Sequence, residues 1–143
     1  MFDLDDCLAF ITARSAKIFV AGLERRFRSY SVTRIQWIAM FYIHENKGIT
    51  QRELADKMAV KEPTVVRLTR ELEQEGIVFR MGSDTDKRIK RLLLTEKGER
   101  VYQEMLPVAE TFKNDTISGI GSEELQTLKD VLNKMVENAQ RPS

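Results

Sequence analysis

The chain has few of the residues that cross-link a protein or anchor it in a membrane. Its 143 residues include one cysteine, Cys7, which cannot form a disulfide within the chain. Such a chain fits a reducing compartment. No stretch approaches the roughly 20 apolar residues that a membrane-spanning helix needs, and the first residues, MFDLDD, are acidic where a secretory signal is basic. These absences predict a soluble, cytoplasmic protein.

The residues of catalytic and cofactor sites are also scarce. His44 is the only histidine, which argues against a histidine-based catalytic set and against a metal cluster. The sequence has no glycine-rich phosphate loop and no acid and base that we can place together. We therefore predict no enzymatic activity, no cofactor and no metal. His44 is expected near a helix end, partly exposed.

The length predicts one domain with its own hydrophobic core. The net charge is only +1, but charge is unevenly spread. Between Arg80 and Arg91 five basic residues stand against two acidic ones, Asp84 and Asp86. A local basic patch indicates nucleic acid or another polyanion as the partner. A solvated charged face is the alternative until a fold supports the patch.

Helix start and stop signals divide the chain. Thr33 with Gln36, and Thr50 with Glu53, have capping-box spacing, and Pro63 suits the first turn of a helix. The expected elements are helices over 5–28, from Thr33 to the ENKG segment, over 51–59 and over 62–74, strands over 77–81 and 88–95, and two helices opening at Thr95 and Ser122. Pro107 predicts a kink in the first of these last two helices.

This order predicts a mainly α protein with a small β-hairpin wing (α+β), a winged helix-turn-helix. In such a fold the second helix of the helix-turn-helix enters the major groove of DNA. The helix over 62–74 presents these outward residues: Pro63, Thr64, Val66, Arg67 and Arg70. Arg67 suits a bidentate contact to guanine and Thr64 a hydroxyl or methyl contact. An ordinary amphipathic helix with a solvated arginine face is the alternative.

The hairpin favours DNA. Its turn is rich in polar residues, and basic residues lie at or just after the tip: Lys87, Arg88, Lys90 and Arg91. An arginine on a narrow tip can enter a minor groove about 6 Å wide. Asp86, two residues before Arg88, can orient that guanidinium through a charge-assisted hydrogen bond. A hairpin carrying solubilising charges is the alternative, but it does not explain the position beside a helix-turn-helix.

The segment DKRIKRLLLT, Asp86 to Thr95, resembles the wing signature D-x-R-x-x-x-L-x-L-T of the MarR family of bacterial transcription regulators. The segment ELADKMAVKEPTVVRLTRELEQEGIVFR is similar to that family's helix-turn-helix. The resemblance implies a single MarR-like domain over 1–143, with dimerisation helices at 1–30 and 105–143 and a DNA-binding winged helix-turn-helix at 33–100. It implies a homodimer on a palindromic operator, with Arg88 in the minor groove and Asp86 orienting it. Lys61 departs from the pattern, because the family often has serine or aspartate as this cap.

The sequence supports the dimer independently, because one winged helix cannot cover the apolar stripes of the first and the last two helices. The resemblance also suggests a repressor with a small aromatic or phenolic effector bound between the dimer helices and the winged helix. Candidate walls of that pocket are Ile11, Arg14, Ile18, Trp37, Met40 and Phe41. Each apolar residue among them could instead be ordinary core.

Two other functions remain open at the level of sequence. One is a thiol-based redox sensor that uses Cys7. The residues one and several turns on, Ile11 and Ala21, are not the tyrosines that support such a thiol in the family, and no lysine or arginine lies within one turn. A structural cysteine is therefore favoured. The other is a winged helix that binds protein and not DNA.

Overall fold

Two capping boxes begin the helices that build the centre of the chain. In the computed structural model, which describes residues 1–82 and 89–143, the Gln36 backbone N–H donates to Thr33 Oγ1 (3.3 Å) and the Thr33 N–H donates to Gln36 Oε1 (3.0 Å). Thr50 and Glu53 exchange the same pair of bonds, at 3.0 and 3.1 Å. The bond from the Thr50 N–H holds the pKa of the Glu53 carboxyl below its ordinary value. Both predicted helix starts are confirmed.

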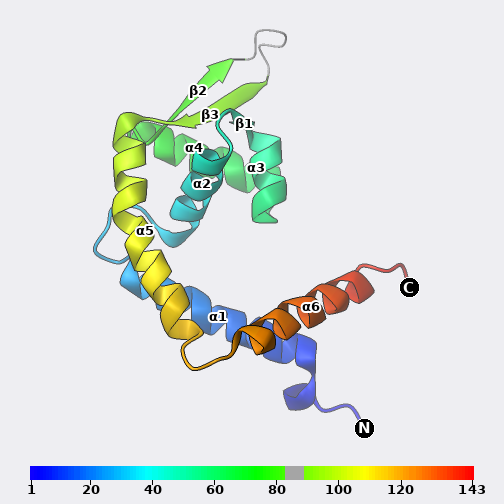
Figure 1. Cartoon of the computed structure of the whole chain (residues 1–143). Helices are drawn as coiled ribbons and strands as arrows, with labels where there is room; N and C mark the ends of the chain where they lie inside the picture. The colour runs from blue at the N-terminus through cyan, green and yellow to red at the C-terminus, as the bar shows by residue number, and fades with distance from the viewer. Residues whose placement is uncertain (83–88) are drawn as a thin grey trace. The chain divides into compact units, whose positions relative to one another are not determined.

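The elements follow in the expected order (Figure 1). The helices are a short 3-10 helix at Leu4–Asp6, α1 at Leu8–Arg26, α2 at Arg34–Glu45, α3 at Gln51–Met58, α4 at Glu62–Gln74, α5 at Glu96–Thr116 and α6 at Ser122–Ala139. The strands are β1 at Ile49–Thr50, β2 at Val78–Gly82 and β3 at Lys90–Leu94. The chain forms two compact units, Met1–Ala109 and Glu110–Ser143. No described helix is long and apolar enough to span a membrane.

The helix-turn-helix consists of α3 and α4. The turn leaves α3 at Ala59, whose left-handed backbone (φ 57°) ends the helix. Pro63 lies in the first turn of α4, as predicted, while the N-cap residue Lys61 makes no side-chain capping bond. The face of α4 opposite the predicted outward residues is buried: Val65, Leu68, Thr69 and Leu72. This burial fixes which side of α4 faces solvent.

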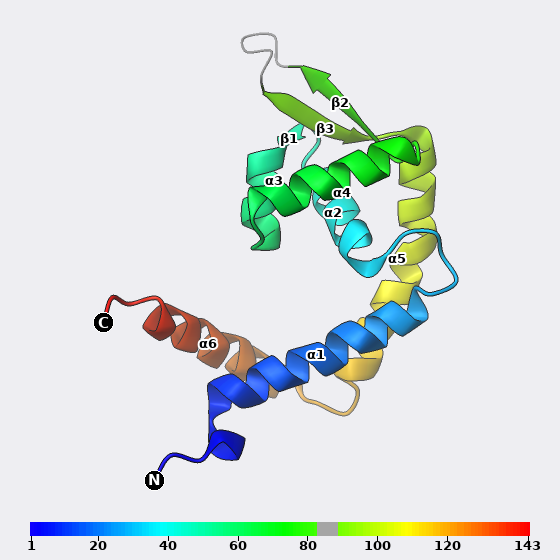
Figure 2. The same cartoon turned by 180° about the vertical axis from the view of Figure 1, so that it is seen from behind.

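The wing belongs to a three-stranded antiparallel sheet with the order β1-β3-β2, where two strands were predicted. β1 was missed because two residues are too short to show the alternation that identifies a strand. Ile49 pairs with Leu92 and Thr50 with Arg91, while β2 pairs along its full length with β3, from Val78–Leu94 to Gly82–Lys90. β3 is therefore the central strand. Figure 2 shows β2 and β3 extending beyond α3 and α4.

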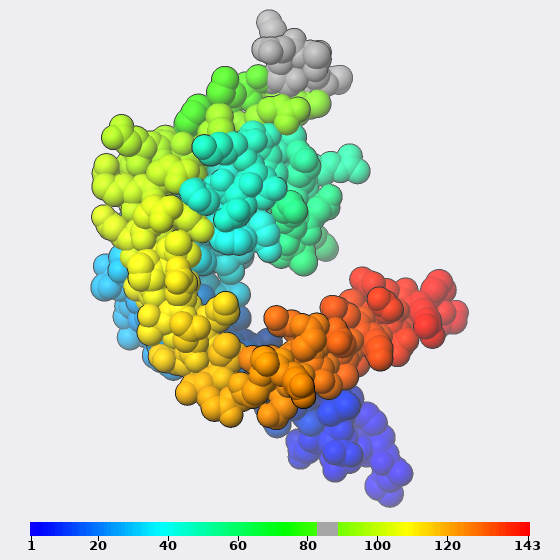
Figure 3. Space-filling model, viewed as in Figure 1, coloured from blue at the N-terminus to red at the C-terminus, as the bar shows by residue number. Residues whose placement is uncertain are grey.

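The core of the first unit lies between α2, the helix-turn-helix, the sheet and the first half of α5. Its largest fully buried side chains are Tyr102, Met40, Ile43, Leu54, Leu68, Leu72, Ile77, Leu92 and Met105. In the space-filling view the segments coloured from cyan to yellow-green pack against one another (Figure 3). Because these side chains come from α2, from both helices of the helix-turn-helix, from β3 and from α5, the positions of α4 and of the base of the wing depend on one another.

The first helix differs from the prediction of 5–28. A 3-10 turn at Leu4–Asp6 precedes it, and Cys7 has an extended backbone (φ −80°, ψ 114°) that separates this turn from α1. α1 ends at Arg26, and only Gly22 of this helix is buried. The helix pattern was continuous across the break because Leu4, Leu8 and Ile11 keep helical spacing.

Thr95 caps α5, as predicted, since the Gly98 N–H donates to Thr95 Oγ1 at 2.9 Å. The Thr95 N–H and hydroxyl donate in turn to the Ile77 and Gly76 carbonyl oxygens. The start of α5 is thereby tied to the chain just before β2. Pro107 lies within α5, and α6 forms most of the second unit without burying any of its residues.

Gly98 makes the closest approach in this region and generates a stability prediction. A Cβ atom at this position would lie 2.1 Å from the Ile77 carbonyl oxygen. Gly98→Ala should therefore lower the free energy of unfolding by about 1–3 kcal/mol, the usual cost of overpacking. The control is Gly82→Ala, whose Cβ would meet only the flexible end of Lys90, at 3.9 Å. Urea unfolding of both variants tests this, and equal midpoints would contradict it.

Candidate DNA-binding surface

The exposed side of α4 carries the residues that were predicted to meet DNA. Pro63, Arg67 and Arg70 are exposed, whereas Thr64 and Val66 are half-buried. Positions 63, 67 and 70 follow each other at the three- and four-residue spacing of one helix face. Arg67 Nη1 lies 3.2 Å from Glu71 Oε1, one turn further on. The Arg67 side chain is still 60% exposed, so this pair holds the guanidinium only weakly.

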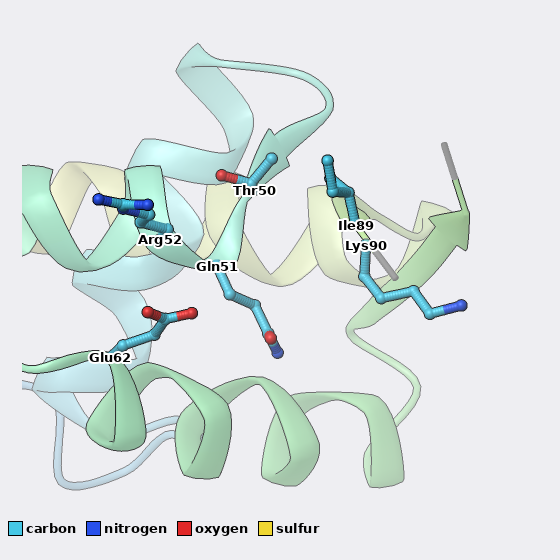
Figure 4. A pocket seen from close by; sticks show the side chains of 6 residues that line it. All are labelled: Thr50, Gln51, Arg52, Glu62, Ile89 and Lys90. Carbon is cyan, nitrogen blue, oxygen red and sulfur yellow. The ribbon is translucent and has the colours of Figure 1, made fainter. Parts of the chain in front are cut away.

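A cleft of about 300 Å³ adjoins the first turns of α3 and α4 and the start of β3. Its walls are Thr50, Gln51, Arg52, Glu62, Ile89 and Lys90 (Figure 4). Gln51 bridges the two helices, because its Nε2 donates to Thr69 Oγ1 at 2.9 Å. The Lys90 ammonium extends away from Gln51 and Glu62. The wing strand and both helices of the helix-turn-helix therefore contribute to one surface.

Gln51 and Arg52 were not among the predicted site residues. The Thr50 capping box does place them in the first turn of α3, but a helix start gives no sign of where it lies in the fold. Glu62 is exposed at the first turn of α4 and adds negative charge there. On this surface Lys90 is exposed, as the wing prediction requires. Of the other predicted wing residues, Asp86, Lys87 and Arg88 lie outside the described residues.

Two guanidinium groups at the base of the wing have partners within the protein. Arg80 Nε of β2 lies 2.6 Å from Glu73 Oε1 of α4. Arg91 Nη1 of β3 donates to the Gly48 carbonyl oxygen at 3.0 Å. The basic residues between Arg80 and Arg91 therefore do not form one uniform free patch.

Some of the residues predicted to bind an effector are buried, and others are exposed. Trp37 and Met40 are buried in α2, Phe41 is half-buried beside Trp37, and their rings lie 6.4 Å apart. On α1, Ile11 is half-buried, while Arg14 and Ile18 are exposed. Three cavities are described: the cleft beside α4, one lined by residues of 46–57 with Arg91, and one lined by residues of 24–34. None of the six residues lines any of them. The unit Met1–Ala109 thus does not bring these six residues together in one of these cavities.

Trp37 is part of an aromatic stack that sequence reasoning did not find. Its ring stacks on Tyr102 of α5 at 5.4 Å, and Tyr102 stacks on His44 at 4.6 Å. His44 Nδ1 lies 2.8 Å from Glu99 Oε2, and His44 is partly exposed near the end of α2, as predicted. Trp37 Nε1 is buried and has no hydrogen-bond acceptor among the described residues. Tyr102 lies 65 residues from Trp37, so no local pattern could have joined them.

Cys7 is a free, half-buried thiol just before α1. Within residues 1–82 and 89–143, no group of three or more histidine, cysteine, aspartate or glutamate side chains is placed to hold a metal ion.

The second helix of the helix-turn-helix buries one face and exposes arginines on the other, and a hairpin adjoins it. These features define a winged helix-turn-helix of the DNA-binding type. Residues 30–89 match the MarR family. The chain is 33% identical to YybA, an HTH-type transcriptional regulator of Bacillus subtilis, over 115 residues, which are 80% of this chain and 77% of that protein. The chain belongs to the MarR family of DNA-binding transcriptional regulators, which are not enzymes, and the resemblance drawn from its wing and helix-turn-helix is confirmed.

Solved structures agree with this fold. The chain is similar to MepR of S. aureus in a MepR–DNA complex, with a TM-score of 0.86, 21% identity and coverage of 92% of this chain and 98% of MepR. It is also similar to BpsR of Bordetella bronchiseptica, with a TM-score of 0.87, 18% identity and coverage of 95% and 97%. At these identities the likeness shows the fold alone. The winged-helix prediction is confirmed.

The Arg67–Glu71 pair generates a prediction about DNA affinity. Glu71→Gln removes a negative charge beside Arg67, so binding to duplex DNA should tighten by roughly two- to fivefold, the equivalent of about 0.5–1 kcal/mol. Stability should fall by no more than about 0.5 kcal/mol, the value of an exposed pair one turn apart. Fluorescence anisotropy with labelled duplex measures the change.

Glu137→Gln is the matched control, because it removes the same charge from α6, outside the winged helix. If both variants tighten binding equally, the effect comes from net charge and not from Arg67. Unchanged binding by Glu71→Gln would show that Arg67 is not at the DNA surface.

Proposed function

We propose that the protein is a ligand-responsive repressor that binds a palindromic operator as a homodimer. α4 lies in the major groove, where Arg67 contacts a base edge and Arg70 a phosphate, with Pro63, Thr64 and Val66 along the same surface. The wing residues Asp86, Lys87, Arg88 and Lys90 meet the adjacent minor groove and backbone. Repression follows from occlusion of the promoter. Such a regulator works in the cytoplasm, with the DNA it controls.

The observation that carries the DNA contact is the division of α4 into two faces. Val65, Leu68, Thr69 and Leu72 are buried on one side, so the helix cannot rotate. Pro63, Arg67 and Arg70 are exposed on the other. Arginine is the side chain best suited to bidentate contacts with guanine and to phosphate. Family membership and the solved MepR–DNA complex of similar fold support this placement.

Exposed apolar side chains on the terminal helices support the homodimer. On α1, Leu8 is 62% exposed and Ile18 65%. On α6, whose residues are all described, none is buried, and Leu128 and Val136 are 55% and 53% exposed. A helix with a long apolar stripe and no buried residue needs a covering surface. A second copy of the chain supplies that surface with two-fold symmetry, which matches the two halves of a palindrome.

The effector is proposed to be a small aromatic acid or phenol. The buried Trp37 Nε1, which has no acceptor among the described residues, supports a polar ligand atom near α2. Phe41 lies beside Trp37, and the exposed Arg14 of α1 offers a cation for a carboxylate. The similar-fold regulator BpsR has its DNA binding regulated by 6-hydroxynicotinic acid, an aromatic acid. In the dimer, Ile11, Ile18 and Met40 would complete the walls.

Such a ligand would act through the spacing of the two recognition helices. Half-sites one turn of DNA apart are separated by about 34–36 Å, so a change of a few ångströms removes contacts at one half-site. The ligand opposes DNA binding only to the extent that it prefers the spacing that does not fit the operator.

The roles of the two α4 arginines give the direct test of the function. A duplex is first selected from a random-sequence library by the wild-type protein, and the proposal requires that the selected site be palindromic. Arg67→Ala should then weaken binding to this duplex by about 1–3 kcal/mol and relax the preference over scrambled DNA, whereas Arg70→Ala should weaken both duplexes alike. Equal weakening of both duplexes by Arg67→Ala would overturn the assignment of Arg67 to a base.

The effector is tested by a thermal-shift screen of aromatic acids and phenols, followed by DNA titration with each compound that raises Tm. A true effector should weaken binding to the selected duplex, and Trp37→Phe, which removes the indole N–H together with the pyrrole ring, should reduce both the shift and the response. A compound that stabilises the protein without changing its DNA affinity would refute the coupling. A screen without any stabilising compound counts against this class of effector.

A further inference from the structure

Two adjacent basic residues at the start of β3 face opposite sides of the sheet. Successive residues of a strand alternate between its two faces. Lys90 lines the cleft shared with Gln51 and Glu62, next to the first turn of α4. Arg91 instead lines a second cavity, of about 280 Å³, with Lys47, Glu53 and Lys57. The side chain of Arg91 is therefore directed away from the cleft beside the recognition helix.

Arg91 has a specific partner on that second side. Its Nη1 donates to the Gly48 carbonyl oxygen at 3.0 Å, while the Gly48 N–H donates to the Leu92 carbonyl oxygen at 3.1 Å. Both backbone polar groups of Gly48 are thus bound by consecutive residues of β3. Gly48 has a φ of +83°, which other residues rarely adopt. This turn immediately precedes β1 and the first residue of α3.

The connection matters because the backbone pairing at this edge is short. β1 and β3 pair through only two positions, Ile49–Leu92 and Thr50–Arg91. The guanidinium extends that ladder by one further bond, to the turn before α3. On the opposite edge, Arg80 of β2 is paired with Glu73 of α4. The base of the wing is therefore fastened at two places, by β2 to α4 and by the Arg91 guanidinium of β3 to the turn that leads into β1 and α3.

We propose that Arg91 is a positioning residue for DNA binding. It sets the direction of the wing relative to α3 and α4 through Gly48 and does not itself contact a phosphate. The inference rests on the proposed binding of DNA by α4 and the wing. The two basic residues of β3 then have different roles. Lys90 faces the DNA, and Arg91 orients the strand on which Lys90 lies.

Salt dependence distinguishes these two roles. A side chain that neutralises a phosphate releases counterions, and removing that side chain reduces the slope of log K against log salt by roughly 0.9 for each phosphate it neutralised. A positioning residue releases none. Arg91→Met removes the guanidinium and keeps most of the aliphatic stem that packs near Gly48. It should weaken binding on the order of tenfold, as for one misplaced contact. Because it acts through Lys90, adding it to Lys90→Ala should leave the slope equal to that of Lys90→Ala alone.

The experiment measures binding of wild type, Arg91→Met, Arg91→Lys and Lys90→Ala to the duplex selected by the wild type, at four salt concentrations. Lys90→Ala is the matched control and should reduce the slope. Arg91→Lys should bind more tightly than Arg91→Met, because an ammonium can still donate to the Gly48 carbonyl. Thermal melts of all four proteins show whether each variant is as stably folded as the wild type before its affinity is compared.

A double variant, Arg91→Met with Lys90→Ala, measures the coupling between the two residues in DNA affinity. General destabilisation of the protein would not produce such a coupling. If Arg91 aims the strand, Lys90→Ala should cost less in the Arg91→Met background than in the wild type. A smaller slope for the double variant than for Lys90→Ala alone would show that Arg91 itself binds phosphate. Affinity of Arg91→Met equal to the wild type would show that the Gly48 contact has no role in DNA binding. Strictly additive effects of the two changes would also overturn the proposal. If the wild type selects no duplex, the proposed operator binding fails, not the role of Arg91.

Discussion

The winged helix depends on the pairing of one central strand, β3, with a strand on each side. β3 pairs with β1 on one side and with β2 on the other, and Leu92 at its centre is fully buried. β1 leads directly into α3, and β2 follows directly after α4. A shift of one residue in the register of β3 would exchange its buried and exposed faces. The register therefore sets the faces of the wing together with the start of the helix-turn-helix.

The same arrangement decides what each basic residue can do. Lysine and arginine look equivalent as a count of charge, but the fold gives each a different surrounding. Arg80 is paired with Glu73, Arg91 with the Gly48 carbonyl, and Arg67 only loosely with Glu71, while Lys90 borders the cleft. An exposed pair such as Arg67–Glu71 contributes little to stability, so the Arg67 guanidinium can leave Glu71 at small cost. The closer pairs serve the geometry of the wing.

Local chemistry made much of the fold predictable. The capping boxes at Thr33 and Thr50, Pro63 in the first turn of α4 and the cap at Thr95 act within four residues, and each lies where the sequence indicated. The inward face of α4 followed from helical spacing alone. Prediction failed at Cys7, where an extended backbone separates a 3-10 turn from α1, and at β1, which is too short to show a pattern. In both places the conformation of one or two residues decided the outcome.

The sequence by itself determined where the helices of the winged helix begin, which face of α4 is buried and which arginines remain outside, because these depend on neighbours within one or two turns. It also carried the family pattern of the helix-turn-helix and the wing. Only the tertiary structure decided that Arg91 meets Gly48, that Gln51 bridges to Thr69, and that Trp37, Tyr102 and His44 stack. These contacts join residues 18 to 65 positions apart. No periodicity encodes them, because they arise only when packing of the core brings separate elements to a common distance.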